Sequence, residues 1–155
     1  MSRWENFKIW RGRLPHWRAD NVTYYATFRH RRELGESDRN LLLRALLKPT
    51  KWDLLAVCVL PGATEMLFTV KYAPSGEPYE LSEVIEKAKQ KAGKEIIKRT
   101  GEKWPPFYTE SYDRIIRDSD ELEERWLALL ASSVELELAE EPEEYDGLYV
   151  AHAPL

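Results

Sequence analysis

Two strands and a tight turn between them are predicted from Val57-Cys58-Val59-Leu60-Pro61-Gly62-Ala63-Thr64-Glu65-Met66-Leu67-Phe68. Pro-Gly is a strong turn signal, and the apolar residues on both sides of it are typical of strands with a buried face. The sequence therefore predicts a hairpin whose strands cover about 52–60 and 65–72.

The elements predicted around this hairpin follow the order strand, helix, strand, strand, helix, strand, helix. Ser37 and Ser82 are the predicted N-caps of the first two helices, and Gly101 is the predicted stop of the second. This order favours an α+β fold, a ferredoxin-like α/β sandwich with a central antiparallel sheet and helices packed on it. In chain order the predicted elements cover 22–29, 37–48, 52–60, 65–72, 82–100, 112–116 and 120–131.

Length and composition predict one globular domain. The chain has 155 residues, of which 43% are hydrophobic and 32% charged, enough to build a core. Residues 1–20 are expected to form a basic and aromatic arm, and residues 135–155 an acidic C-terminal tail. The longest apolar run is too short to cross a bilayer and no signal peptide is recognised, so we expect a cytoplasmic protein. Cys58 is predicted to be a small buried hydrophobe.

Charge is distributed unevenly along the chain. Residues 1–50 carry 11 Lys or Arg against 5 Asp or Glu, a net charge of +6. Residues 101–155 carry 4 against 15, a net charge of −11. Seven of the twelve residues 135–146, the acidic segment, are Asp or Glu. The basic half can meet phosphate and the acidic segment cannot, so the acidic segment is predicted either to mask DNA-binding side chains or to be a solvated tail.

The hairpin turn resembles the signature of the single-tyrosine HUH transposases, in particular the REP-associated tyrosine transposase branch. In that family the strand is followed by Met-Pro-Asn-His-hydrophobic-His-Leu-Leu. Leu60-Pro61 matches the start of the signature and Gly62 stands for its Asn. Ala63 and Glu65 stand where the family has its two histidines.

Three further segments extend this resemblance over most of the chain. They match the family's opening, its nucleophile segment and its closing segment in the same order. The register set by Asp113-Arg114 and Arg117-Asp118 places Ser111 at the nucleophilic tyrosine, with Tyr112 next to it. The matching segments are 13–17 with 22–29, 107–118, and 131–136 with 141–145.

The resemblance implies a reaction whose groups are missing from this chain. In the family, a tyrosine attacks a DNA phosphodiester while a metal held by the two histidines polarises the phosphate. Ala63 offers no ligand, Glu65 is expected to be a solvated residue at a hairpin edge, and Ser111 is an unactivated hydroxyl. We therefore predict an inactive protein that needs no metal or other cofactor.

Tyr112 is the possible surrogate nucleophile. Because it lies one residue from the matching position, its side chain is expected to point elsewhere and to pack as a core or sheet aromatic. An active transposase that uses Tyr112 is one hypothesis for the function, and it is less favoured than the two hypotheses given next.

Binding of single-stranded or hairpin DNA is the leading prediction. The resemblance implies a domesticated transposase-like protein, and we expect a monomer. Cations and aromatic residues alternate in two clusters, and four lysines share one face of the second helix, where solubility is the alternative explanation. A protein-interaction module that has lost DNA binding is the second hypothesis. The candidate DNA-binding residues are Arg11, Arg13, His16, Trp17, Arg18, Arg29, Arg31, Arg32, Lys87, Lys91, Lys94 and Lys98.

Overall fold

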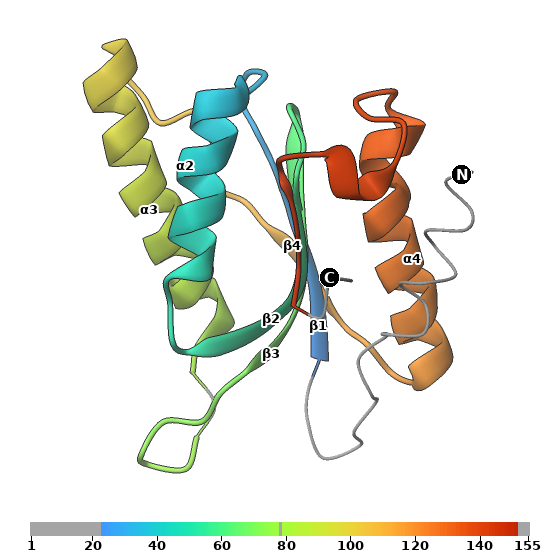
Figure 1. Cartoon of the computed structure of the whole chain (residues 1–155). Helices are drawn as coiled ribbons and strands as arrows, with labels where there is room; N and C mark the ends of the chain where they lie inside the picture. Colours follow the sequence, from blue (N-terminus) through green and yellow to red (C-terminus); the bar gives the residue numbers. More distant parts are fainter. Residues whose placement is uncertain (1–22, 78, 152–155) are drawn as a thin grey trace.

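A five-stranded antiparallel sheet forms the middle layer of the molecule (Figure 1). The computed structural model describes residues 23–77 and 79–151. The strand order is β4-β1-β3-β2-β5, which confirms the predicted α+β, ferredoxin-like arrangement and adds a fifth strand to it. The strands are β1 (Thr23–Arg29), β2 (Trp52–Val59), β3 (Ala63–Val70), β4 (Tyr112–Ile115) and β5 (Leu148–Val150).

Helices cover both faces of the sheet. Helices α2 (Glu36–Leu47) and α3 (Leu81–Thr100) lie on one face, and α4 (Ser119–Glu135) lies on the other with the short 3-10 helix η1 (Pro142–Glu144) (Figure 1). Alternate side chains of each strand point to opposite faces, so the sheet separates two buried clusters. Phe28, Phe68 and Ile96 belong to the cluster under α2 and α3. Cys58, Leu67 and Trp126 belong to the cluster under α4.

The helix ends differ from the prediction at both N-termini. Helix α2 begins at Glu36 with Gly35 as its N-cap, and α3 begins after Glu80; neither cap residue makes a side-chain hydrogen bond. The predicted caps Ser37 and Ser82 are therefore wrong. The stop at Gly101 is confirmed, because this glycine has a φ of 77° and its N–H donates to the carbonyl of Ile97 at 2.8 Å.

Residues 135–151 are part of the fold, so the solvated-tail alternative is wrong for this part of the chain. Tyr145 is only 7% exposed, and its hydroxyl donates to the carbonyl of Val59 at 2.7 Å. Strand β5 then pairs with β2 and closes that edge of the sheet. Gly147 allows this close approach, since a Cβ at this position would lie 2.3 Å from the carbonyl oxygen of Val59.

Cys58 is fully buried, as predicted, and burial together with the charge of Glu65 raises the pKa of its thiol. Over the described part of the chain, no helix is long and apolar enough to cross a membrane.

Candidate nucleic-acid interface

Sheet register brings the family-like positions together on the face covered by α4. Residues directly opposite each other on antiparallel strands point to the same face. Glu65 of β3 pairs with Thr27 of β1, and Thr27 pairs in turn with Tyr112 of β4. Ala63 pairs with Arg29 in the neighbouring row. The two positions that correspond to histidines therefore lie on the same face as Tyr112 and beside Arg29.

Glu65 is a hydrogen-bonded residue in the middle of the sheet and not a solvated residue at a hairpin edge. The Tyr25 hydroxyl donates to its Oε2 at 3.1 Å, and the Ser132 hydroxyl of α4 donates to its Oε1 at 2.9 Å. The sequence expectation failed because β3 begins at Ala63, earlier than predicted, and because the partner from α4 is distant in sequence. Glu65 links α4 to strands β1 and β3.

The hydrogen bond to Glu65 and the burial of Tyr25 change the pKa of Tyr25. Burial, with the charge of Glu65 and its hydrogen bond, raises the pKa of Tyr25 from 10.0 to about 12. The guanidinium of Arg125 lies 4.7 Å from the centroid of the same ring and opposes the shift.

Alkaline pH is therefore expected to weaken the fold through Tyr25. Because the folded-state pKa is raised, the stabilisation is complete below pH 10.0 and is lost as pH rises toward about 12. Tyr25→Phe should lower the free energy of unfolding by about 1 kcal/mol at neutral pH and flatten its fall at alkaline pH. Urea unfolding of both proteins across this range measures the effect. Tyr145, whose pKa is also raised, is present in both proteins and contributes equally to their pH dependence. If the free energy of unfolding falls as steeply with pH in the variant as in the wild type, Tyr25 is not the group responsible.

A cleft of about 470 Å³ opens between the ends of β1 and β4, and we call it the β1–β4 cleft. Ser111 and Tyr112 both line it. Tyr112 was predicted to be a core or sheet aromatic; it lies in the sheet, as the first residue of β4, but is 57% exposed and does not pack in the core. It begins the edge strand β4, where its ring faces solvent on the α4 side. The lining residues are Thr27, Phe28, Arg29, Tyr108, Glu110, Ser111 and Tyr112.

Two arginines contact the ring of Tyr108 at this cleft. The guanidinium carbons of Arg29 and Arg31 lie 5.8 Å and 5.5 Å from its centroid, within cation–π range. Both arginines are exposed, and Tyr108 is 41% exposed. Neither arginine has a carboxylate partner within residues 23–77 and 79–151. Their N–H groups can therefore meet phosphate while the neighbouring aromatic faces meet bases.

His30 points to the opposite side of the strand from these two arginines. Its Nδ1 donates to the Pro61 carbonyl at 2.8 Å, so the neutral ring accepts at Nε2 from the Thr64 hydroxyl at 2.9 Å. Burial lowers the pKa of His30. His30 is thus a buried structural side chain beside the hairpin turn.

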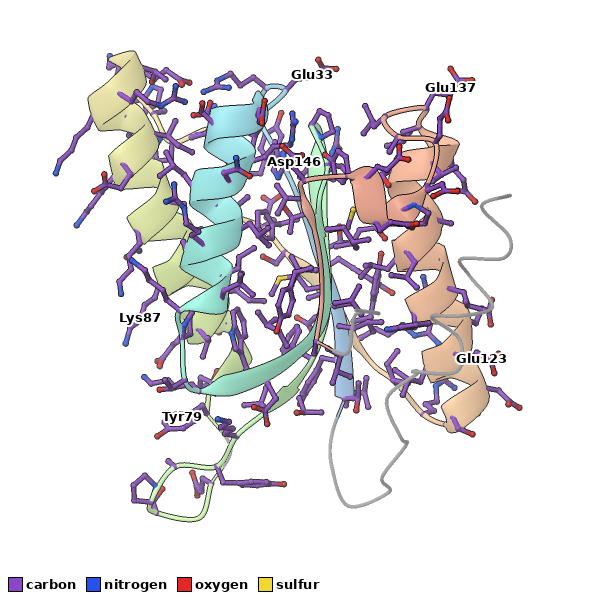
Figure 2. The ribbon with its side chains drawn as sticks, viewed as in Figure 1. Glu33, Tyr79, Lys87, Glu123, Glu137 and Asp146 are labelled. Carbon is purple, nitrogen blue, oxygen red and sulfur yellow. The ribbon has the colours of Figure 1, made fainter. Side chains whose placement is uncertain are left out.

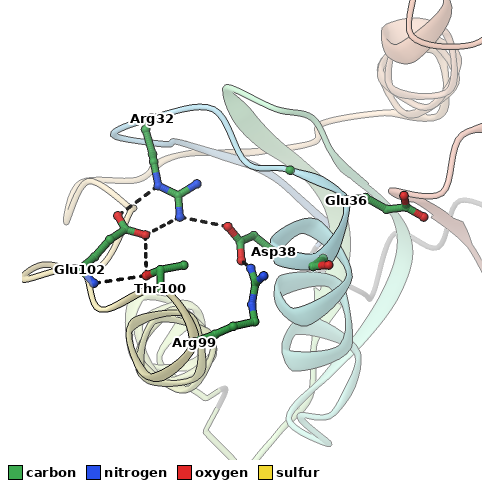
Figure 3. A pocket seen from close by; sticks show the side chains of 8 residues that line it. Arg32, Glu36, Asp38, Arg99, Thr100 and Glu102 are labelled. Carbon is green, nitrogen blue, oxygen red and sulfur yellow. Dashed lines mark hydrogen bonds and ion pairs between the residues drawn. The ribbon is translucent and has the colours of Figure 1, made fainter.

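Arg32 is held in an ion-pair network away from the cleft (Figure 3). Its guanidinium donates to Glu102, with Nε at 3.0 Å, and to Asp38 at 2.9 Å, while Arg99 also pairs with Asp38. The hydrogen bond from Arg32 lowers the pKa of Glu102. The predicted basic cluster is therefore divided, because Arg32 joins α2 to the end of α3 while Arg29 lines the cleft and Arg31 contacts the ring of Tyr108.

The four candidate lysines of α3 are all exposed on the other side of the sheet. Figure 2 shows Lys87 pointing away from the sheet, and Lys98 pairs with Glu95 at 3.9 Å. The stripe lies apart from the β1–β4 cleft, so no single site includes both. The arm residues Arg11, Arg13, His16, Trp17 and Arg18 lie outside the described residues.

Metal-ligand clusters were sought in the described part of the chain. In this part, no three His, Cys, Asp or Glu side chains lie close enough together to hold a metal ion. Glu65, which stands where the family has a metal-binding histidine, accepts hydrogen bonds from two hydroxyl groups.

Two polar residues of the segment 107–118, Arg114 and Asp118, have structural roles here. Arg114 donates from Nε to Glu121 at 2.8 Å, and Asp118 caps α4 by accepting from the N–H of Glu121 at 2.8 Å. These contacts fix the entry into α4. Tyr108, Thr27 and Glu110 were not predicted as cleft residues. Tyr108 and Glu110 lie outside the helices and strands, where no periodic pattern of apolar residues indicates which side chains are exposed.

Comparison with known proteins finds a similar fold among solved structures. No protein-family model matches this sequence, and no curated protein does. A structure described as that of a REP-associated tyrosine transposase bound to a REP hairpin is similar, with a TM-score of 0.64. The match has 14% sequence identity and covers 86% of this chain and 81% of that chain. At this identity, the likeness shows that the two proteins share a fold.

Proposed function

We propose that this protein binds single-stranded or hairpin DNA through the β1–β4 cleft and does not cut it. The observation that carries the proposal is the pair Arg29 and Arg31, without carboxylate partners among the described residues, against the exposed ring of Tyr108. Tyr112 adds a second exposed ring to the same cleft. Cations that meet phosphate beside aromatic faces are the usual means of holding unpaired nucleotides.

Unpaired nucleotides fit this cleft better than a duplex does. Stacking on Tyr108 or Tyr112 needs an exposed base face, which a duplex keeps covered by its neighbouring base pairs. A hairpin offers both a loop of unpaired bases and flanking single strands. The similar solved structure is described as bound to a hairpin, which supports this choice of ligand.

Absence of cutting follows, in this proposal, from the groups at the family-like positions. Ala63 has no ligand atom, and both oxygens of Glu65 accept hydrogen bonds from hydroxyl groups. Ser111 lies at an exposed position, and the described histidine, His30, is occupied by Pro61 and Thr64. An unactivated serine is a weak nucleophile.

A gel-shift experiment tests the binding. We expect hairpin and single-stranded oligonucleotides to shift more strongly than a duplex of the same length and to dissociate as salt rises. Equal binding of the duplex would contradict the proposed stacking. No binding of any of the three would favour the protein-interaction module.

The second test concerns cleavage. Incubation with Mg²⁺ or Mn²⁺ is expected to give neither nicked single-stranded DNA nor a covalent protein–DNA adduct, because Ala63 and Glu65 replace the family's histidines and Ser111 its tyrosine. Denaturing gels of a labelled oligonucleotide check both products. Tyr112→Phe is the control, because an adduct that this substitution abolishes would establish the active alternative.

A protein-interaction module is the second candidate function. Leu136 and Leu138 are exposed at the end of α4, within the acidic segment. Exposed apolar residues among carboxylates can contact a basic protein surface. Binding of DNA and binding of such a partner would use different residues.

A further inference from the structure

Lys89 is the one lysine of α3 that is buried among the described residues, with 4% of its surface exposed. It lies four residues after Ile85 and three before Ala92, so the helix places it on the apolar face. The four lysines predicted to face DNA lie on the same helix and are exposed. A buried lysine carries a desolvation cost, which lowers the pKa of Lys89.

The ammonium group of Lys89 is hydrogen-bonded to backbone carbonyls beside the cleft. Its Nζ donates to the carbonyl of Tyr108 at 2.6 Å and to that of Thr109 at 3.4 Å. It also lies 3.4 Å from Glu86 and 4.9 Å from the centroid of the Phe28 ring. These contacts use the donors of the ammonium and surround it with groups that favour a cation.

These bonds lie where the chain leaves regular pairing with β1. The N–H of Tyr108 donates to the carbonyl of Arg29 at 3.1 Å, and pairing resumes at Tyr112, opposite Thr27. Residues 109–111 between these points have no ladder partner in β1, so Lys89 supplies donors for carbonyls that the sheet does not use. Lys89 reaches them from the α3 side, while Arg29 lies on the α4 side.

We propose that Lys89 is a positioning residue that fixes Tyr108 against Arg29 and Arg31, and so sets the shape of the DNA-binding cleft. This inference rests on the proposed function, because it assigns Lys89 a role in a site whose ligand is proposed. Lys89 touches no DNA itself. It determines where the stacking ring lies by holding the backbone behind it.

Hydrogen exchange tests the positioning without DNA. In Lys89→Met, exchange of the Tyr108 amide, which donates to the carbonyl of Arg29, is expected to rise about tenfold or more, while that of the central strands β2 and β3 stays unchanged. Lys91→Met, which removes an exposed lysine of the same helix, should leave both regions unchanged. Unchanged exchange of the Tyr108 amide in Lys89→Met would overturn the inference even if the protein does not bind DNA. If Lys89→Met does not fold, Lys89→Gln, which keeps an amide donor, replaces it in the same measurement.

A double-mutant cycle tests the coupling to DNA. Lys89→Met and Tyr108→Ala should each weaken binding of the hairpin oligonucleotide about tenfold, which is the usual effect of losing one stacked base. The double variant should bind about as well as either single variant, because both remove the same stacking. The salt dependence of Lys89→Met should match that of the wild type, since no phosphate contact is lost. Additive losses, or a shallower salt dependence in Lys89→Met, would overturn the inference, and absence of wild-type binding would instead refute the proposed function.

Discussion

Replacing both Arg29 and Arg31 with alanine is expected to weaken hairpin binding roughly a hundredfold near physiological salt, about tenfold for each cation. Both guanidinium groups lie against the Tyr108 ring, and neither is neutralised by a carboxylate within the described residues. Each should therefore contact phosphate. The slope of log affinity against log salt concentration should become shallower by about two.

The matched control for this double variant removes two exposed cations elsewhere. Arg44 lies in the last turn of α2 and Lys48 directly follows that helix, and both are exposed. The alanine variant of both has the same net charge as the cleft variant, and it should keep most of the affinity and the salt slope. Equal losses in the two variants would indicate that overall charge, and not the cleft, holds DNA. Fluorescence anisotropy at several salt concentrations provides both quantities.

Truncation after Val134 is expected to abolish cooperative folding. It removes the buried ring of Tyr145, the hydrogen bond from that ring to Val59 and the whole of β5. Loss of one buried aromatic side chain alone costs about 3 to 5 kcal/mol, a large part of the total stability of a typical domain. Exposure of the β2 edge and of apolar residues under α4 adds to this loss.

Thermal unfolding followed by circular dichroism measures this effect. A chain that ends at Ala151 keeps β5 and is the control, which should unfold cooperatively near the wild-type temperature. A sharp transition in the shorter chain would show that the last strand is dispensable.

Masking of the cleft by the acidic segment therefore needs a test that preserves the fold. Substitution of its exposed carboxylates by glutamine leaves Tyr145 and β5 in place. If the segment masks the cleft, the substituted protein should bind the hairpin more tightly and with a steeper salt dependence. The exposed glutamates for this substitution are Glu135, Glu137, Glu140, Glu143 and Glu144, while exposed Asp146 is kept because it pairs with Arg39 at 3.4 Å.

The layout of the sheet could be predicted because its signals are local. The Pro61-Gly62 turn, the apolar runs beside it and the stop at Gly101 each depend on neighbouring residues. The helix N-termini could not be placed, because serines that could cap a helix occur within the first turn at Ser37 and Ser82, while the backbone begins the helix earlier.

The candidate site depended on contacts between distant residues. Strand alternation explains afterwards why Arg29 faces the cleft and the next residue, His30, does not. The Glu102 partner of Arg32 and the carbonyl groups that accept from Lys89 come from distant segments of the sequence, and no local pattern marks these contacts. Strand β5 is only three residues long, too short for a periodic signal.

Closure of the sheet by β5 has a consequence for the folding rate. Tyr145 and Val59 are 86 positions apart, so their contact forms only after a long loop has closed, and loop closure costs entropy that no local contact offsets. We expect the β2–β5 pairing to form late in refolding, after the β2–β3 hairpin. Until then the β2 edge is unpaired, and a second unfolded chain can pair with it. The yield of refolding should accordingly fall as protein concentration rises.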